Sequence, residues 1–130
     1  MKKAAKKKKV SPIPKGYSVL TPYLSIKGAA AALEFYKRAF GAKQRMKISG
    51  PNGSIGHAEM TIDGAVIMLA DEFPGIGTAA PASLNGTTSS LMLYVKDVDA
   101  AFARALADGA TQIFAPTDKL YGDRSGALKD

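Results

Sequence analysis

Tyr23-Leu24-Ser25-Ile26-Lys27 runs into an Ala-rich segment that ends at Gly41-Ala42, and the chain contains this unit twice. Leu93-Tyr94-Val95-Lys96-Asp97 likewise runs into an Ala-rich segment, which ends at Gly109-Ala110. Lys27 and Lys96 lie 69 residues apart, about half the length of the chain. A strand–helix unit repeated at this spacing predicts two similar modules that face each other across a pseudo-twofold axis. The groove between two such modules is a natural site for a small molecule.

The first copy begins a β-α-β-β-β module over residues 17–71. Residues 17–26 alternate between apolar and polar side chains, which is typical of a half-buried strand, with Thr21 and Tyr23 on its polar face. Gly28 breaks this strand, and residues 29–40 carry apolar side chains at helical spacing until Gly41 ends the helix. Residues 43–48 are predicted to form the second strand.

A hairpin completes the first module. Residues 55–62 alternate, so that His57 and Glu59 share one face with Thr61. Asp63-Gly64 is the strongest two-residue hairpin signal in the chain, and residues 65–70 return as an apolar strand.

The second copy repeats this order after a linker over residues 72–89, which is rich in Gly, Pro, Ala and Ser. Module two covers residues 90–130, and its first strand, 90–95, places Ser90, Met92 and Tyr94 on one face. A helix capped by Asp97 or Asp99 follows, then strands at 111–114 and 122–128. Nothing in the sequence corresponds to residues 65–70, so we expect this module to lack its last strand.

Composition restricts the class of protein. The formal net charge is +7, but seven of the 18 basic residues lie in residues 1–15, and the others are balanced by 11 acidic residues. We therefore expect residues 1–16 to be a disordered Lys-rich tail, residues 17–130 to be a single domain, and no specific nucleic-acid partner. A nucleic-acid-binding arm is the alternative for the tail.

Cysteine is absent, which excludes disulfides and thiol chemistry. No apolar run is long enough to span a membrane and no secretory signal is present, so we expect a cytoplasmic protein without a membrane partner.

Four segments resemble the vicinal oxygen chelate superfamily, which contains glyoxalases, bleomycin-resistance proteins and extradiol dioxygenases, and the likeness is closest to its PhnB-like members. The segments are TPYLSIKGAAAALEFYKRAFGA (21–42), HAEMTIDGAVIMLADE (57–72), LMLYVKDVDAAFARALADGA (91–110) and YGDRSGALKD (121–130). The resemblance implies an α+β fold of two tandem β-α-β-β-β modules, whose curled mixed sheets form a cup. It also implies a homodimer, since such proteins commonly pair modules between chains.

The resemblance further implies where a metal would bind. Metal-dependent members place ligands on the first strand of each module and on its hairpin. Glu59 matches the expected carboxylate ligand, whereas Thr21 and Ser90 stand where His or Gln is usual, and the final acidic ligand would lie on the strand that we expect to be absent. Because a transition metal needs three or four N or O donors, the full four-ligand site is not present in this chain.

His57 and Glu59 are nevertheless the candidate catalytic pair, and the same two residues are the candidate metal ligands. An i, i+2 spacing on a strand places both side chains on one face, where they could act as acid and base or bind a divalent cation together. His57 is also the only imidazole in the chain. The alternative is that this face is polar because it meets water.

The sequence thus predicts a protein that holds a small organic molecule in the cup between its modules. The candidate ligand-binding residues, which come from both modules, are Thr21, Tyr23, Ser90, Met92, Tyr94 and Arg124. Arg124 could bind an anionic group of the ligand, or it could pair with Asp118 or Asp123 at the surface. The alternative function is a divalent-metal-dependent lyase, isomerase or dioxygenase that uses Glu59 and His57. The sequence does not decide whether the protein is an enzyme. It makes no cofactor certain, and a divalent metal is the one candidate.

Overall fold

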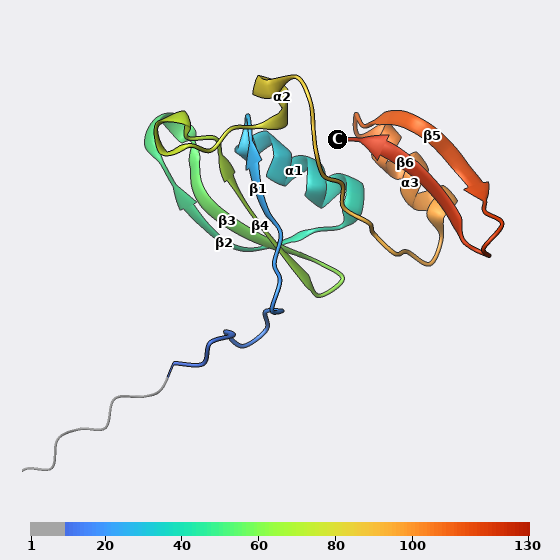
Figure 1. The fold of residues 1–130 in the computed structure, drawn as a ribbon, viewed down its shortest axis with the longest axis horizontal. Coiled ribbons are helices and arrows are strands. Elements are labelled where there is room, and N and C mark those ends of the chain that lie inside the picture. The colour runs from blue at the N-terminus through green and yellow to red at the C-terminus, as the bar shows by residue number, and fades with distance from the viewer. Residues whose placement is uncertain (1–9) are drawn as a thin grey trace, which may run out of the picture.

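A computed structural model describes residues 10–130 and shows an α+β fold with a mixed sheet (Figure 1). The first nine residues of the predicted Lys-rich tail lie outside the described residues. The elements in chain order are β1 (Tyr23–Ile26), α1 (Ala29–Phe40), β2 (Lys43–Ser49), β3 (Ile55–Ile62), β4 (Ala65–Asp71), the one-turn helix α2 (Pro81–Leu84), α3 (Val98–Ala107), β5 (Thr111–Asp118) and β6 (Arg124–Lys129), with single 3₁₀ turns at Pro51–Gly53 and Pro74–Ile76. No helix in this described part is long and apolar enough to cross a membrane.

The first module forms a four-stranded sheet in the order β1-β4-β3-β2. β1 runs parallel to β4, whereas β2, β3 and β4 are antiparallel neighbours. The predicted hairpin at Asp63-Gly64 is confirmed. Both residues have positive φ angles, 51° and 85°, as the tight turn that best matches strand twist requires.

One face of this sheet is the core, and α1 covers it. Ala58, Met60 and Ile62 of β3 are buried there with Leu33 and Tyr36 of α1. Gly41 ends α1 in the left-handed conformation, with a φ of 67°, as the sequence predicted. The alternate residues of β3, His57 and Glu59 among them, therefore point to the opposite face of the sheet.

Asp71, the last residue of β4, ties four elements of this module together. Its Oδ1 accepts hydrogen bonds from the backbone N–H groups of Gly28 and Ala29 at the start of α1, at 3.0 and 2.9 Å. Its Oδ2 accepts from the N–H of Ile55 at the start of β3, at 2.7 Å. Its backbone pairs with Ile26 at the end of β1. Partial burial raises the pKa of Asp71, but the three N–H donors outweigh it and the pKa is lowered.

The second module consists of α3 and the β5–β6 hairpin, and α3 lies beside α1 (Figure 1). Small buried side chains, Ala39 of α1 and Ala105 of α3, allow the two helices to approach closely, and Ala110, which follows α3, belongs to the same cluster. Asp97 caps α3 by accepting from the N–H of Ala100 at 3.0 Å, which confirms one of the two predicted caps. The hydroxyl of Tyr36 donates to the side chain of Asp130, which adds a polar link between the modules.

Two predicted strands differ from the structure. Residues 17–22 are not part of β1: Pro22 has no N–H to donate, and the chain before it leaves the sheet. Residues 90–95 do not form a strand either, so that prediction is wrong. β1 has β4 as its sole neighbour, and the second module has no strand equivalent to β4 among the described residues. Because an unpaired strand is not stable in water, residues 91–95 have no regular secondary structure and no backbone hydrogen bonds in the described structure.

The geometry of Asp71 predicts a pH-dependent loss of stability. Asp71→Asn keeps one acceptor oxygen but removes the charge and turns an amide toward backbone donors, so the free energy of unfolding should fall by about 1–3 kcal/mol at pH 7. Because the pKa of Asp71 is lowered in the folded protein, this stabilisation is present above the ordinary value of 3.8 and is lost as the pH falls through the lowered value.

Urea unfolding at several pH values measures the difference in stability between Asp71→Asn and the parent. The exposed Asp123→Asn serves as control. Equal stability of Asp71→Asn and the parent at pH 7 would contradict the assigned role.

Candidate functional site

Glu59 is the one buried charged residue of the described structure, with 5% of its surface exposed. It lies on β3, two residues after His57, on the face of the sheet that points away from α1. Burying a carboxylate is unfavourable unless hydrogen-bond donors replace the lost water. The neighbours of Glu59 are therefore the first place to look for a site.

Three side chains form a hydrogen-bonded chain with Glu59. Nε2 of His57 lies 2.8 Å from Oε2 of Glu59, and the hydroxyl of Tyr23 lies 2.7 Å from Nδ1 of His57. The hydroxyl of Tyr17 donates to the other Glu59 oxygen, Oε1. Because an ionised carboxylate only accepts, the proton of a neutral His57 lies on Nε2, and Nδ1 accepts from Tyr23.

The charge state of Glu59 follows from these contacts. The hydrogen bond from His57, followed by that from Tyr17, lowers the pKa of Glu59, and this effect outweighs desolvation. The same Tyr17–Glu59 bond raises the pKa of the Tyr17 phenol. At neutral pH the site therefore holds a carboxylate and a neutral phenol.

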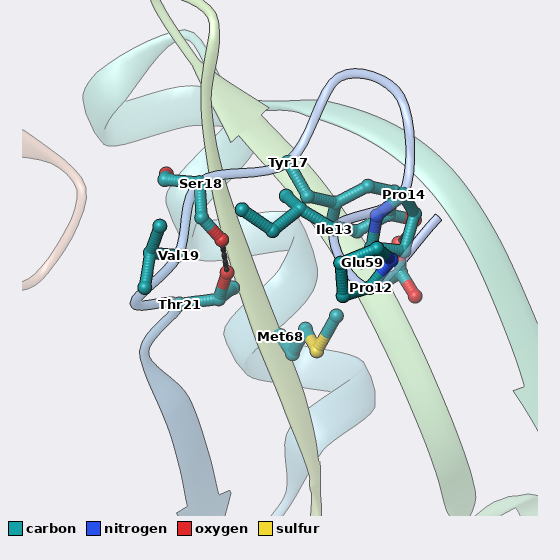
Figure 2. Close-up of a pocket in the computed structure, with 9 residues that line it drawn as sticks. All are labelled: Pro12, Ile13, Pro14, Tyr17, Ser18, Val19, Thr21, Glu59 and Met68. Atoms are coloured by element: carbon teal, nitrogen blue, oxygen red, sulfur yellow. Dashed lines mark hydrogen bonds between the residues drawn. The ribbon is translucent and has the colours of Figure 1, made fainter. Parts of the chain in front are cut away.

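Residues 12–19 cover this face of the sheet and explain why Glu59 is buried. Figure 2 shows the segment passing over Glu59 of β3 and Met68 of β4, which are paired neighbours in the sheet. Between the segment and the sheet lies a pocket of about 330 Å³. Its lining residues are Pro12, Ile13, Pro14, Tyr17, Ser18, Val19, Thr21, Glu59 and Met68.

Arg45 completes the site from β2. The pairing of β2 with β3 shifts between Gln44 and Met46, so Arg45 is the extra residue of a bulge. Bulges re-aim side chains. Here the guanidinium carbon of Arg45 lies 4.6 Å from the centre of the Tyr17 ring, which is a cation–π contact.

The structure brings four of the predicted site residues together. Glu59, His57 and Tyr23 are joined by hydrogen bonds, and Thr21 lines the adjoining pocket. The sequence pattern does not indicate Tyr17 or Arg45 as site residues, because residues 17–26 alternate as a strand does and the bulge at Arg45 has no sequence signal. A search for donors to a buried Glu59 could have found Tyr17.

The structure does not bring the predicted second-module residues to this pocket. Ser90, Met92 and Tyr94 lie in the unpaired segment, where Tyr94 is 81% exposed. Arg124 forms a two-pronged ion pair with Asp99, at 3.0 and 2.9 Å, and a further contact with Asp118 at 3.2 Å. Of the two predicted surface partners of Arg124, Asp118 is thus observed.

The donor set at Glu59 does not fit a transition-metal site. The described residues contain no group of three or more His, Cys, Asp or Glu side chains placed to hold a metal. His57 and Glu59 are bonded to each other, and the remaining Glu59 oxygen and His57 nitrogen are engaged by Tyr17 and Tyr23. Two donors are fewer than the three or four that such a metal needs.

Comparisons with known proteins identify relatives of the chain. A family model described as Glyoxalase/Bleomycin resistance protein/Dioxygenase superfamily matches residues 20–130. The uncharacterized protein Mb0911c of Mycobacterium bovis is 43% identical over 114 residues, which cover 85% of this chain and 75% of that protein. The uncharacterized protein Rv0887c of Mycobacterium tuberculosis is equally identical, with 67% of its length covered.

Solved structures share the fold. TioX from Micromonospora sp. ML1 has a TM-score of 0.62 and 25% identity, with 85% of this chain and 86% of that chain covered. A PhnB protein from Bacillus cereus has a TM-score of 0.62 and 22% identity, with 87% and 92% covered. A glyoxalase/bleomycin resistance protein/dioxygenase family enzyme from Burkholderia phytofirmans PsJN has a TM-score of 0.58 and 22% identity, with 82% and 86% covered.

The buried carboxylate predicts a second pH-dependent effect on stability. Glu59→Gln removes the charged acceptor of His57 and Tyr17, so the free energy of unfolding should fall by about 1.5–3 kcal/mol at pH 7. The pKa of Glu59 is lowered from its ordinary value of 4.5, so the difference should shrink as the pH falls below that value.

Glu34→Gln is the matched control for this measurement, because Glu34 forms an exposed pair with Lys37 and its substitution should leave stability nearly unchanged. Denaturant unfolding of both variants gives the comparison. If Glu59→Gln and Glu34→Gln change the free energy of unfolding by the same small amount, Glu59 is not a buried charged residue.

Proposed function

The chain belongs to the glyoxalase/bleomycin resistance protein/dioxygenase superfamily, and we propose that it binds a small organic molecule on the polar face of its first sheet, at Glu59. The observation that carries this proposal is a buried, ionised carboxylate with a histidine partner beside a pocket. At about 330 Å³ the pocket is within the range of small-molecule sites.

The chemistry of the pocket supports a neutral, partly apolar ligand. Met68 and Ile13 offer apolar walls, and Thr21 offers a hydroxyl. Glu59 accepts from the Tyr17 hydroxyl and Arg45 lies over the Tyr17 ring, so opposite charges lie near each other and the site has no excess charge to attract a strong anion. Such a site selects a ligand by the positions of its hydrogen-bonding groups rather than by its net charge.

The proposal includes a cup between the two modules, as in the resemblance to PhnB-like members. In it, Ser90, Met92 and Tyr94 contribute to the opposite wall, while Arg124 stays in its ion pairs with Asp99 and Asp118. The internal repeat supports this arrangement, because the equivalent strand β1 contributes Tyr23 to the Glu59 cluster.

A second copy of the chain belongs to the same proposal. Residues 91–95 expose five successive large apolar side chains without backbone partners in the described structure. Contiguous exposed apolar surface of this kind usually meets another protein surface. We propose a homodimer in which this segment is covered.

The alternative function is catalysis, and the His57–Glu59 pair favours one form of it. A carboxylate that orients an imidazole, which in turn contacts a half-exposed phenol, can relay a proton to or from a bound molecule. A metal-dependent lyase, isomerase or dioxygenase would need further ligands from outside the described residues. Metal analysis of protein purified without chelator tests metal-dependent catalysis. One equivalent of bound Zn, Ni, Mn or Fe would support it.

A fragment screen followed by NMR tests the proposed ligand site. Bound molecules should shift the amide signals of Thr21, Tyr23, His57 and Met68, and Glu59→Ala should weaken binding about tenfold or more, because a charged hydrogen bond is lost. Glu34→Ala should leave the affinity unchanged. If the hits cluster elsewhere, or if Glu59→Ala binds as the parent does, the site is assigned wrongly.

Light scattering after size exclusion tests the proposed dimer. The parent should have twice the mass of one chain, and Met92→Lys or Tyr94→Lys should shift it toward the monomer, because a charge is costly in a buried interface. Leu120→Lys, in the exposed turn between β5 and β6, is the control. A parent that is monomeric across micromolar concentrations would contradict the dimer.

A further inference from the structure

Tyr17 occupies the Glu59 site as a small aromatic molecule would. Its hydroxyl donates to Oε1 of Glu59, and its ring lies under the guanidinium of Arg45 at 4.6 Å. Gly16, the residue before Tyr17, has a positive φ of 88°, a backbone conformation that favours glycine. The phenol is therefore held at its hydroxyl and at one face of its ring.

The segment that carries Tyr17 has few other ties to the sheet. Within the described structure, residues 10–21 form no backbone hydrogen bond to a strand, and the hydrogen bonds of Tyr17 N–H, Ser11 and Thr21 stay inside the segment. Tyr17–Glu59 is its one hydrogen bond to the sheet. Segments with so few backbone ties open at low free-energy cost.

We propose that Tyr17 holds the place of a phenolic ligand, so that a small molecule with an aromatic ring and a hydroxyl binds between Glu59 and Arg45 by displacing residues 12–19. This inference rests on the proposed ligand site at Glu59. The hydroxyl of the ligand donates to the carboxylate, and the ring takes the cation–π contact. Residues 12–19 then compete with the ligand for the position between Glu59 and Arg45.

The electrostatics of the site select a phenol over similar molecules. Glu59 is ionised, so it repels an aromatic carboxylate and accepts from a neutral hydroxyl. A ring without a hydroxyl leaves the buried Glu59 oxygen without its donor, which is the strongest basis for rejecting an analogue. Met68 and Thr21 lie beside Glu59 and are not among the displaced residues 12–19, so they remain to contact a substituent on the ring.

The test uses 4-methylphenol, which reproduces the side chain of Tyr17, and the variant Tyr17→Ala, which vacates its place. Calorimetry should show 4-methylphenol binding to Tyr17→Ala about tenfold or more tighter than to the parent, because the internal competitor is gone. Toluene and benzoate should bind at least about tenfold more weakly than 4-methylphenol. Adding Glu59→Gln to Tyr17→Ala should lower the affinity for 4-methylphenol by a similar factor.

Two further variants keep the test decisive. Tyr17→Phe keeps the ring and removes the hydroxyl, so it should bind 4-methylphenol more tightly than the parent does. This comparison does not depend on the folding of Tyr17→Ala. Tyr121→Ala, in an exposed turn, removes a tyrosine that has no part in the site and should bind as the parent does.

The outcomes separate this inference from the proposed function. If the parent, Tyr17→Phe and Tyr17→Ala bind 4-methylphenol equally, or if toluene binds as well as 4-methylphenol, Tyr17 is not a stand-in for the ligand. If 4-methylphenol does not bind but another class of fragment shifts the signals around Glu59, the phenol inference fails and the ligand site remains. If no molecule perturbs that face, both fail.

Discussion

The carboxylate of Asp71 is the contact on which the arrangement of the first module depends. It receives N–H groups from the start of α1 and the start of β3, while its own backbone pairs with the end of β1. Four elements of the first module thus meet at one side chain. Because the side chains of a strand alternate between its faces, fixing β3 under α1 also decides that His57 and Glu59 lie on the other face.

That opposite face creates the second constraint, because it carries a charge that is not left in water. Glu59 is buried by a segment that comes from outside the sheet, and the segment brings a hydroxyl donor with it. Burial and hydrogen bonding are linked here: a cover without a donor would leave the carboxylate desolvated and partly unpaired. Residues 12–19 can therefore bury Glu59 only because Tyr17 donates a hydrogen bond to it.

The parts of the fold that follow from local chemistry could be predicted from the sequence. Asp63-Gly64 specifies its turn by backbone conformation alone, Gly41 ends α1 in the same way, and the alternation along β3 correctly placed Glu59 and His57 on one face. Residues 90–95 have equally good strand composition, yet they form no strand. Strand formation depends on a neighbour, and composition carries no information on whether that neighbour is present. The contact of Tyr17 with Glu59 spans 42 residues and lies outside any regular element, so no periodic pattern could have indicated it.

The two modules also differ in what their first strands can do for a site. β1 is fixed by β4, and Tyr23 is thereby held against His57. The equivalent residues of the second module are free of backbone pairing in the described structure, so Tyr94 has no comparable fixed position. A binding site needs side chains whose positions are set before the ligand arrives, since ordering them on binding reduces affinity. The ordered half of the site therefore lies in the first module. Any group that covers Glu59 there, whether Tyr17 or a ligand, must supply an O–H or N–H donor to the oxygen that Tyr17 now occupies.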